Sequence, residues 1–428
     1  MKKVALHNLG CKVNAYETDA MQEMLEQHGY EIVPFQEKAD IYIINTCTVT
    51  NMADRKSRQM IHRAKKMNPE ALVVAAGCYV QAQEESGQID ECIDVLIGNN
   101  RKKDLIRILE EHIQKAVIDI NHTKEYEEMH IQKTAEHTRA YIKVQDGCNQ
   151  FCTYCIIPYA RGRVRSRAKE DVIQEVRDLA RNGYQEVVLT GIHLSSYGVD
   201  LENESLLSLI LAVHEVEGIQ RIRLGSLEPR IITEEFAKTI SALPKMCPHF
   251  HLSLQSGCDE TLRRMNRRYT SAEYLEKCEL LRKYFNNPAL TTDVIVGFPG
   301  ETEEDFLETM SLVEECKYDN AFTFIFSVRR GTPAEKIKDN TSLSEKEERL
   351  QRLNEVVNKY FLENNQKLVG TVLNVLVEGV SEKKDMYYGY SDTNKLINFT
   401  SSKELMPGDL VDVEITSAKT WSLDGKVK

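Results

Sequence analysis

The first 118 residues alternate between short apolar segments and longer segments in which apolar positions recur every three or four residues. This alternation predicts strands and amphipathic helices in turn, and therefore an α/β domain with an open parallel sheet. Asn68-Pro69 is expected to end the second helix. The expected strands are Val4–His7, Ile41–Ile44, Leu72–Ala76 and Val95–Ile97, and the expected helices are Tyr16–His28, Met52–Lys66 and about Arg101–Gln114.

A second and longer alternation of strands and helices occupies residues 139–366, and it predicts six β/α units. Six units make an incomplete barrel that leaves room for a large substrate. Catalytic groups in such barrels lie at the carboxyl ends of the strands, and the residues expected there are polar and rich in glycine. The expected strands are Tyr141–Val144, Glu186–Leu189, Arg221–Leu224, His251–Leu254, Thr292–Val296 and Phe322–Phe326.

Two further segments complete the expected organisation. Residues 119–138 are polar and lack periodicity, which indicates a linker between the first two domains. In residues 367–428 the apolar period falls to two, which predicts a small all-β barrel. Such barrels often bind oligonucleotides across one face, although a pure docking module is an alternative. Its expected strands are Val372–Val377, Tyr387–Tyr390, Lys395–Phe399 and Leu410–Ile415, with Ser422–Lys428 closing the sheet.

Cys148, Cys152 and Cys155, here called the barrel trio, follow the first strand of the expected barrel in a C-x3-C-x2-C array. Cysteine thiolates are the usual ligands of iron–sulfur clusters. These spacings let one loop present three sulfurs to a single cubane, whose fourth iron is then open for another ligand. Zinc would require a fourth Cys or His close by, and none follows. Three unconnected buried thiols are the other alternative.

Cys11, Cys47 and Cys78, here called the N-terminal trio, each lie just past the carboxyl end of an expected strand. In an open parallel sheet those ends converge on the ligand crevice, so three thiols distant in sequence are expected to meet. We interpret them as ligands of a second cluster with one open iron, against the alternative of three separate buried thiols.

Net charge argues against a nucleic-acid partner at first sight, because it is −11. The distribution of charge matters more than its sum, and three segments are strongly basic: Arg55–Lys66, Arg161–Lys169 and Arg263–Arg268. A solvated helix face is the ordinary explanation of such a segment. The second one directly follows the barrel trio, so Arg161, Arg163 and Arg165 are candidate RNA contacts.

Eleven cysteines without a signal peptide or a long apolar segment indicate a reducing, cytoplasmic location and no membrane association. No phosphate-binding glycine motif of the nucleotide hydrolases or dinucleotide enzymes is present.

The C-x3-C-x2-C array resembles that of the radical S-adenosylmethionine (SAM) superfamily, whose members bind SAM at the open iron. The resemblance implies that Tyr154 lies beside the adenine. Polar or glycine residues at successive strand ends then become candidate SAM contacts, and they are Gly191, His193, Ser226, Glu228, Gln255 and Gly297. A packed structural role is an equal alternative for His193.

Over essentially the whole chain the domain order and motifs resemble the methylthiotransferases, with a final domain similar to the TRAM module. The motifs are NLGCKVN, NTCTVT, AGCYVQ, DGCNQFCTYCIIPYARGRVRSR, LTGIHLSSYG, RIRLGSLEP, LSLQSG, TDVIVGFPGET and FSVRRGTPA. NLGCKVN is most similar to the branch that modifies N6-threonylcarbamoyladenosine beside the tRNA anticodon. His193, where the isopentenyladenosine branch has asparagine, favours the same branch.

This resemblance implies two 4Fe–4S clusters, with SAM and a tRNA anticodon stem-loop as cofactor and substrate. A SAM-derived radical would remove the hydrogen at C2 of the adenine at position 37, which acid–base catalysis cannot readily remove. The N-terminal cluster would supply sulfur and a second SAM the methyl group. A reduced flavodoxin or ferredoxin-type electron donor, an unidentified sulfur source and a monomer or weak dimer are also expected.

Three other functions remain open at this point. The enzyme could act on isopentenyladenosine in tRNA or on an aspartate of a ribosomal protein, since those branches share all six cluster cysteines. A non-catalytic iron–sulfur protein that binds RNA or senses redox state is the third. The candidate SAM contacts argue against it, because a binding protein needs no open iron.

Overall fold

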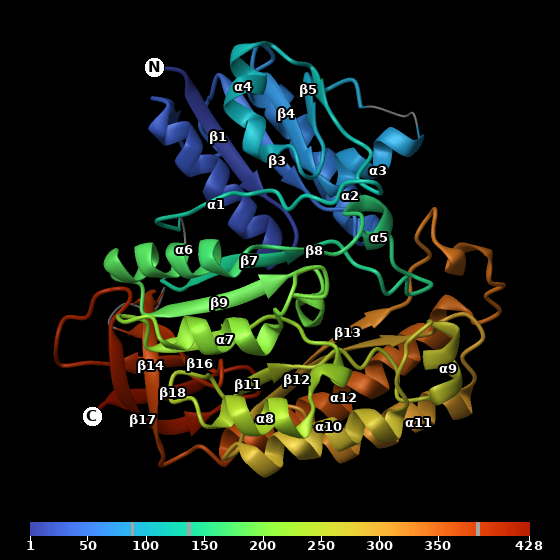
Figure 1. Cartoon of the computed structure of the whole chain (residues 1–428). Coiled ribbons are helices and arrows are strands. Elements are labelled where there is room, and N and C mark those ends of the chain that lie inside the picture. Colours follow the sequence, from blue (N-terminus) through green and yellow to red (C-terminus); the bar gives the residue numbers. More distant parts are fainter. Residues whose placement is uncertain (87–89, 135–137, 382–385) are drawn as a thin grey trace.

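The computed structural model describes residues 1–86, 90–134, 138–381 and 386–428, without the side chains of residues 84–86. It consists of an N-terminal domain stacked on an open barrel, with a small β-barrel at one end (Figure 1). This arrangement confirms the predicted α/β fold class with a C-terminal all-β barrel. No helix in the described part of the chain combines the length and apolarity of a membrane span.

The N-terminal domain is a parallel sheet with the strand order β2-β1-β3-β4-β5-β6. Central strand β3 is buried along its whole length, as a strand covered by helices on both faces must be. Thr50 begins α2 by accepting a hydrogen bond from the Ala53 amide. The elements are β1 (Lys3–Asn8), α1 (Lys12–Gln27), β2 (Glu31–Ile32), β3 (Ile41–Thr46), α2 (Asn51–Met67), β4 (Leu72–Gly77), α3 (Cys78–Ser86), β5 (Val95–Ile97), η1 (Lys102–Asp104), α4 (Leu105–Glu110) and β6 (Lys115–Ala116).

The helix expected over residues 101–114 is shorter than predicted. Only Leu105–Glu110 is α-helical, and His112 then takes a left-handed conformation with φ of 56°. The chain thereby leaves the helix and adds edge strand β6 to the sheet. An apolar period of three to four residues cannot reveal such a stop when the residue that turns the chain is not glycine.

The second domain is the predicted incomplete barrel. Its six parallel strands form two hydrogen-bonded groups, β10-β9-β7 and β11-β12-β13, which single bridges connect between β10 and β11; short β8 pairs antiparallel to β7. The elements are β7 (Ala140–Asp146), α5 (Ile157–Ala160), β8 (Arg165–Ser166), α6 (Lys169–Arg181), β9 (Glu186–Gly191), η2 (Leu194–Ser196), α7 (Leu206–His214), β10 (Arg221–Leu224), η3 (Pro229–Ile231), α8 (Glu234–Ser241), β11 (His249–His251), α9 (Asp259–Arg264), α10 (Ser271–Tyr284), β12 (Ala289–Val296), α11 (Glu303–Cys316), β13 (Asn320–Ile325), η4 (Pro333–Lys336) and α12 (Leu343–Gln366).

The described part of the expected linker, residues 119–134 and 138, is a packed strap rather than a solvated connection. Met129 and Ile131 are buried, and the Met129 carbonyl accepts a 2.6 Å hydrogen bond from the Tyr16 hydroxyl of α1. The Ile131 amide donates to Glu175 of α6 at 2.7 Å. The strap therefore joins the two domains through buried contacts on both, which its polar composition does not indicate.

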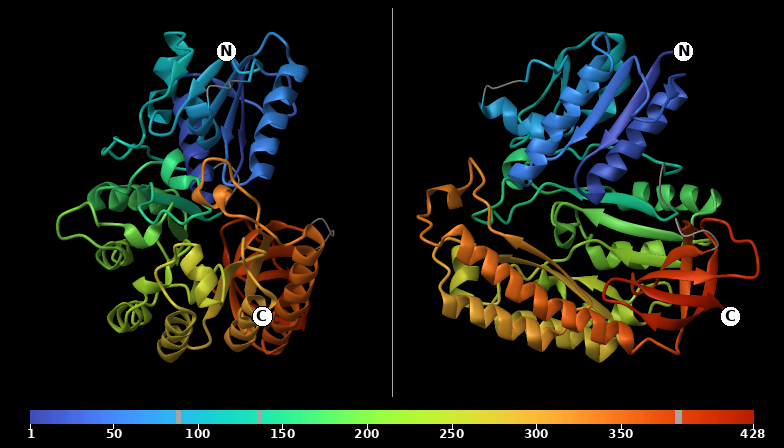
Figure 2. Two further views of the ribbon diagram at one scale, coloured as in Figure 1. Left: turned by 90° about the vertical axis from the view of Figure 1, so that its right-hand side faces the viewer. Right: turned by 180° about the vertical axis from the view of Figure 1, so that it is seen from behind.

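The C-terminal domain is a closed five-stranded barrel of order β14-β15-β16-β18-β17, lying at the amino ends of the large barrel's strands (Figures 1 and 2). Its strands are β14 (Val372–Val380), β15 (Tyr387–Ser391), β16 (Leu396–Thr400), β17 (Leu410–Ala418) and β18 (Leu423–Val427). The turn between β15 and β16 docks on buried charge. Arg223 donates to the carbonyls of Ser391 and Asp392, and Glu186 accepts from Arg223 at 2.7 Å.

Glu186 therefore controls the docking of the small barrel. It is fully buried; burial alone would raise its pKa, but Arg223, Arg139 and Arg221 together lower it. Glu186→Gln should lower the free energy of unfolding by about 3 to 5 kcal/mol, because it leaves buried arginines unpaired. The single tryptophan, Trp421, contacts Phe361 of α12. Its fluorescence can therefore follow the docking of the small barrel while the protein is unfolded in urea.

The effect should depend on pH. A carboxyl with a lowered folded pKa stabilises the protein above its ordinary pKa, and that contribution disappears as pH falls through the folded pKa. The difference between wild type and Glu186→Gln should therefore shrink in acid. Exposed Glu217→Gln is the control. Equal unfolding midpoints for Glu186→Gln and wild type at neutral pH would contradict this role of Glu186.

Candidate functional site

The N-terminal trio lies at one edge of the sheet, where three neighbouring strands end. Asn8 of β1 pairs with Asn45 of β3, which pairs with Ala76 of β4, so the strands end level with one another. Cys11, Cys47 and Cys78 follow within three residues of those positions. A Cβ atom added to Gly10 would lie 3.0 Å from the Cys47 sulfur, so the Cys11 loop passes directly over Cys47.

Electrostatic contacts confirm that the three thiols lie near one another. The charges of Cys78 and Cys11 act on Cys47, and that of Cys78 acts on Cys11. Burial raises the pKa of Cys47 to about 11. A metal or cluster must therefore displace protons from these thiols when it binds. Their role as ligands remains a prediction, which their convergence supports.

Arg161 joins the N-terminal trio to the barrel domain. It follows α5, directly after the barrel trio, and its side chain is fully buried. Its Nε donates to the Cys78 sulfur at 3.1 Å, and its two terminal nitrogens donate to Glu17 at 2.8 and 3.1 Å and to Asn14 at 2.7 Å. The guanidinium of Arg161, a residue of the barrel domain, thus contacts both a candidate cluster ligand and helix α1 of the N-terminal domain.

Buried charges around Arg161 form one network across the interface. Glu17 of α1 pairs with Lys102 at 3.0 Å and with Lys143 of β7 at 2.8 Å. Asp146, at the end of β7, pairs with Lys143 at 2.7 Å and with Arg161 at 3.2 Å. Burial alone would raise the pKa of Glu17, but Arg161, Lys102 and Lys143 hold it well below the ordinary value. Both carboxylates are therefore ionised.

The network contains more positive than negative charge. Four fully buried cations, Lys102, Lys143, Arg161 and Arg165, face two buried carboxylates, Glu17 and Asp146. Buried charge is costly without a partner, so an anion is needed beside this excess. Arg161 marks the place for this anion, because it donates to the Cys78 sulfur, where an anionic thiolate-bound cluster would lie. The residues present therefore fit such a cluster.

Burial also corrects the prediction for the second basic segment. Arg161 and Arg165 are fully buried and engaged within the protein, so they cannot contact RNA as expected. Arg163 alone of the three is exposed, and its guanidinium lies 4.6 Å from the centre of the Phe151 ring. Every residue of RGRVRSR except Arg163 is buried, which net charge cannot indicate.

The barrel trio lies on a tight loop after β7. Gly147 at its start has φ of 70°, and a Cβ there would lie 1.8 Å from the Arg163 carbonyl oxygen, so this position requires glycine. The Gln150 amide donates to the Cys148 sulfur at 3.5 Å, and Arg267 donates to the Cys152 sulfur at 3.4 Å. Burial raises the pKa of Cys148 to about 11 and that of Cys155 to about 12.

An open cavity of about 160 Å³ lies over this loop. It borders on all three sulfurs of the barrel trio. Of the residues predicted to contact SAM, five line it: Tyr154, His193, Ser226, Glu228 and Gln255. Its polar groups come from successive strand ends of one barrel.

His193 offers the cavity an unpaired buried nitrogen. Its Nδ1 lies 2.7 Å from the Ser196 hydroxyl, while its Nε2 has no partner in the protein. Burial, with the charges of Arg267 and Arg230, lowers the pKa of His193 to about 4, so the ring is neutral at physiological pH. A neutral imidazole with one free nitrogen can exchange a hydrogen bond with a ligand, which fits SAM better than a purely structural role.

Gly191 and Gly297 are not among the residues that line the cavity. A Cβ at Gly191 would lie 2.8 Å from the side-chain oxygen of Gln145, which accepts a hydrogen bond from the His193 amide. Gly297 has φ of 71°, and a Cβ there would meet Lys346 of α12 at 2.4 Å. Both glycines therefore serve the packing of the strand ends, and the direct SAM contacts predicted for them lack support.

Two arginines that the sequence did not single out as site residues contact the site. Arg267 belongs to the third basic segment and holds Cys152, as described above. Arg329 lies past β13 and pairs with Asp54 of α2 at 2.6 Å, while also donating to Thr48 beside Cys47. Its position just past a strand end of the barrel could have identified Arg329 as a site residue from the sequence.

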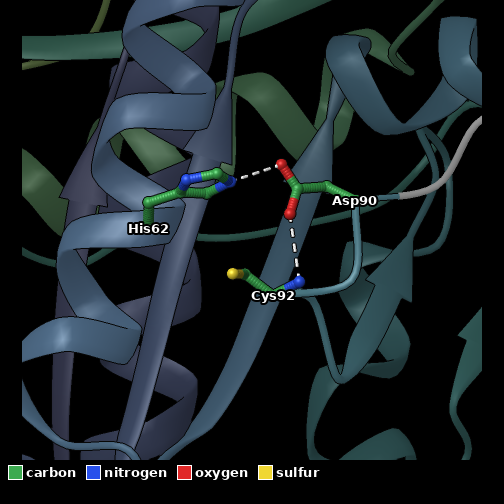
Figure 3. A group of neighbouring side chains, drawn as sticks. All are labelled: His62, Asp90 and Cys92. Atoms are coloured by element: carbon green, nitrogen blue, oxygen red, sulfur yellow. Dashed lines mark hydrogen bonds and ion pairs between the residues drawn. The ribbon is translucent and has the colours of Figure 1, made fainter.

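His62, Asp90 and Cys92 form a separate surface group, whose possible ligand atoms lie within 4.8 Å of one another (Figure 3). His62 pairs with Asp90 at 2.7 Å, and the Cys92 amide donates to the same carboxylate at 3.0 Å. Burial and the Asp90 charge raise the pKa of Cys92, which disfavours the thiolate that a metal needs. This group is an ion pair that fixes a loop to α2.

Arg161→Gln tests the interface network. It removes one guanidinium from Glu17, Asp146 and the Cys78 sulfur, so anaerobically reconstituted protein should lose up to about half of its roughly eight irons. The melting temperature should fall as well, because a buried pair is broken. Arg163→Gln, two residues away and exposed, should retain both properties. Equal iron content and melting temperature in the two variants would show that Arg161 does not support the N-terminal trio.

Three segments of the chain match known families. Residues 142–313 match the Radical SAM superfamily, residues 3–98 match Uncharacterized protein family UPF0004, and residues 366–428 match the TRAM domain. A solved radical SAM methyltransferase, TsrM from Kitasatospora setae, has a similar fold, with a TM-score of 0.57 at 16% identity over 78% of this chain and 77% of that one.

Similarity to curated proteins extends along the whole chain. It is 38% identical to the Threonylcarbamoyladenosine tRNA methylthiotransferase MtaB of Bacillus subtilis (strain 168), over 98% of this chain and 94% of that protein. It is also 38% identical to a tRNA-2-methylthio-N(6)-dimethylallyladenosine synthase of Thermoanaerobacter pseudethanolicus, over 99% of this chain and 92% of that protein. The chain therefore belongs to the radical SAM tRNA methylthiotransferases, transferases whose cofactors are 4Fe–4S clusters and SAM.

Proposed function

We propose that this tRNA methylthiotransferase acts on C2 of N6-threonylcarbamoyladenosine next to the anticodon, at position 37. Overall identity cannot choose the substrate, because relatives named for threonylcarbamoyladenosine and for dimethylallyladenosine are equally similar. The local sequence carries the proposal: NLGCKVN around Cys11 resembles the threonylcarbamoyladenosine branch, and His193 differs from the asparagine of the isopentenyladenosine branch. His193 supports it further, since it lines the cavity and its buried Nε2 has no hydrogen-bond partner in the protein.

We assign the barrel trio to the cluster that binds SAM. Cys148, Cys152 and Cys155 would hold three irons, and the amino and carboxylate groups of SAM would occupy the fourth. His193, Glu228 and Gln255 are placed around the same cavity to bind polar groups of SAM, with Tyr154 beside the adenine. When bound, this pair supplies one-electron cleavage of SAM and a carbon-centred radical able to take an unactivated hydrogen.

Arg267 and Tyr154 would shape the chemistry without reacting. Arg267 donates to the Cys152 sulfur and also to the Ser253 carbonyl and the Tyr269 hydroxyl, so its guanidinium is fixed on three sides. A fixed cation beside a cluster sulfur favours the more negative, reduced state. Tyr154 packs on Phe298 with ring centres 6.3 Å apart, which keeps an apolar wall beside the cavity.

We assign the N-terminal trio to the second cluster, which would provide the sulfur. Its thiols lie where the N-terminal domain meets the barrel domain, with Arg161 bound to Cys78 on one side and Arg329 bound beside Cys47 on the other. A base entering between the domains would then lie within reach of both trios. The two-domain interface thus positions the sulfur source.

The substrate is tested by mass spectrometry of nucleosides from tRNA. A strain that lacks the gene should lose the 2-methylthio group from N6-threonylcarbamoyladenosine, and the wild-type gene should restore it. Loss of the group from isopentenyladenosine instead would assign the enzyme to that branch. A change confined to a ribosomal-protein aspartate would exclude tRNA as the substrate.

The two trios are tested by separate substitutions. Replacing Cys148, Cys152 and Cys155 by alanine should leave about half of the iron and abolish SAM cleavage. Cys47→Ala should retain SAM cleavage but prevent thiomethylation, because the radical site is intact and the sulfur source is not. Buried Cys247→Ala is the control, since Cys247 belongs to neither trio. Thiomethylation by Cys47→Ala would remove the N-terminal trio from the reaction.

A further inference from the structure

Helix α2 carries a row of exposed cations. Residues Arg55, Lys56, Arg58, Arg63 and Lys66, here called the basic face, are spaced so that they lie on one side of the helix. The only acid of α2, Asp54, is buried and paired with Arg329. Among the described residues, none of these five cations forms an ion pair with a carboxylate.

The remaining basic residues of α2, His62 and Lys65, do not belong to the basic face. Lys65 is paired with Asp94 at 2.7 Å. His62 is engaged with Asp90 in the surface group seen in Figure 3. The face therefore presents five positive charges to solvent on a protein whose net charge is −11. Such a local excess indicates an anionic partner, because overall charge would otherwise repel one.

The position of α2 links its basic face to the site. The first turn of the helix is fixed to the barrel mouth, where Asn51 donates to the Val328 carbonyl at 2.9 Å and Asp54 binds Arg329. Ser57, one turn further, donates to the Cys47 carbonyl at 3.1 Å. Helix α2 thus begins beside the N-terminal trio and runs away from it along one face of the sheet (Figure 2), and the basic face follows the helix.

The dimensions suit a nucleic-acid backbone. Arg55 and Lys66 are eleven residues apart, so the row is about 17 Å long at 1.5 Å per residue. A protein surface that follows a phosphate backbone needs such a line of cations rather than a compact cluster. The other two basic segments cannot provide one, because Arg161 and Arg165 are buried, Arg263 is paired with Glu260, and Arg264 with Asp305.

We propose that the basic face of α2 binds backbone phosphates of the RNA whose base enters the site. The identity of that RNA as tRNA rests on the proposed function. The phosphates would belong to the stem that continues outward from the modified base, since the face points away from the N-terminal trio. These contacts fix the stem and carry no base specificity.

Lys56→Gln with Arg63→Gln tests the proposal in reconstituted holoenzyme, by tRNA binding between about 50 and 200 mM salt. Both side chains are exposed, so folding is unaffected. The loss of two phosphate contacts should reduce the magnitude of the slope of log affinity against log salt by about 1.5 to 2. It should also weaken the binding of all tRNAs to the same extent. SAM cleavage without tRNA should stay at the wild-type rate.

Lys2→Gln with Lys38→Gln is the matched control. It removes the same charge from exposed lysines that precede β1 and β3, at the opposite edge of the same sheet. Its salt slope should equal that of wild type. An unchanged slope in the α2 variant, or an equal decrease in both variants, would overturn the proposal.

An acidic electron-donor protein is the competing partner. Slower cluster reduction by reduced flavodoxin in the α2 variant, with tRNA binding unchanged, would assign the face to that protein and overturn the RNA proposal. Failure of the proposed function looks different, because the wild-type enzyme itself would then leave tRNA unmodified while its binding could still respond to the α2 substitutions.

Discussion

The structure depends on a buried ionic network that no single domain could contain. Glu17 comes from α1 of the N-terminal domain, whereas Lys143, Asp146 and Arg161 come from the barrel domain. Separating the domains would leave these charges unpaired, at a cost of several kcal/mol for each buried ion. The network therefore makes the two domains one unit and fixes the orientation in which the two cysteine trios approach each other.

Arg161 is central because it contacts both the carboxylates of the network and a sulfur of the N-terminal trio. Its donors reach two carboxylates that hold the interface and one sulfur of the N-terminal trio. The excess of buried cations over carboxylates would then balance the negative charge of the thiolates and their cluster. The same feature explains why a basic sequence beside a cluster loop is a structural part of the protein rather than a surface for RNA.

A second arginine acts in the same way on the other side. Arg329 leaves the end of β13 and binds Asp54 and Thr48, next to Cys47. With Arg161 at Cys78, the N-terminal trio is held from the barrel domain at two of its three members. Rigid positioning of this kind would suit a reaction that brings together the groups held by two separate cysteine trios.

Much of this could be predicted from the sequence. The strand Val95–Ile97 agrees because it is a continuous apolar segment, as buried parallel strands usually are. The convergence of Cys11, Cys47 and Cys78 follows from where β1, β3 and β4 end. Burial of charged side chains could not be predicted. Arg161 and Arg165 have the composition of a solvated surface, and only the fold pairs them with Glu17 and Asp146. The packing of Gly191 against the Gln145 side chain likewise could not be predicted from the sequence.

The central claim is that the two trios hold two clusters facing one cavity. Electron paramagnetic resonance of the fully reduced, reconstituted protein tests it directly, because two paramagnets that lie close together broaden each other's signals. The account predicts a wild-type spectrum broader than the sum of spectra from Cys47→Ala and Cys152→Ala, each of which retains one complete trio. A wild-type spectrum equal to that sum would place the clusters too far apart to act on one substrate, and would contradict the account.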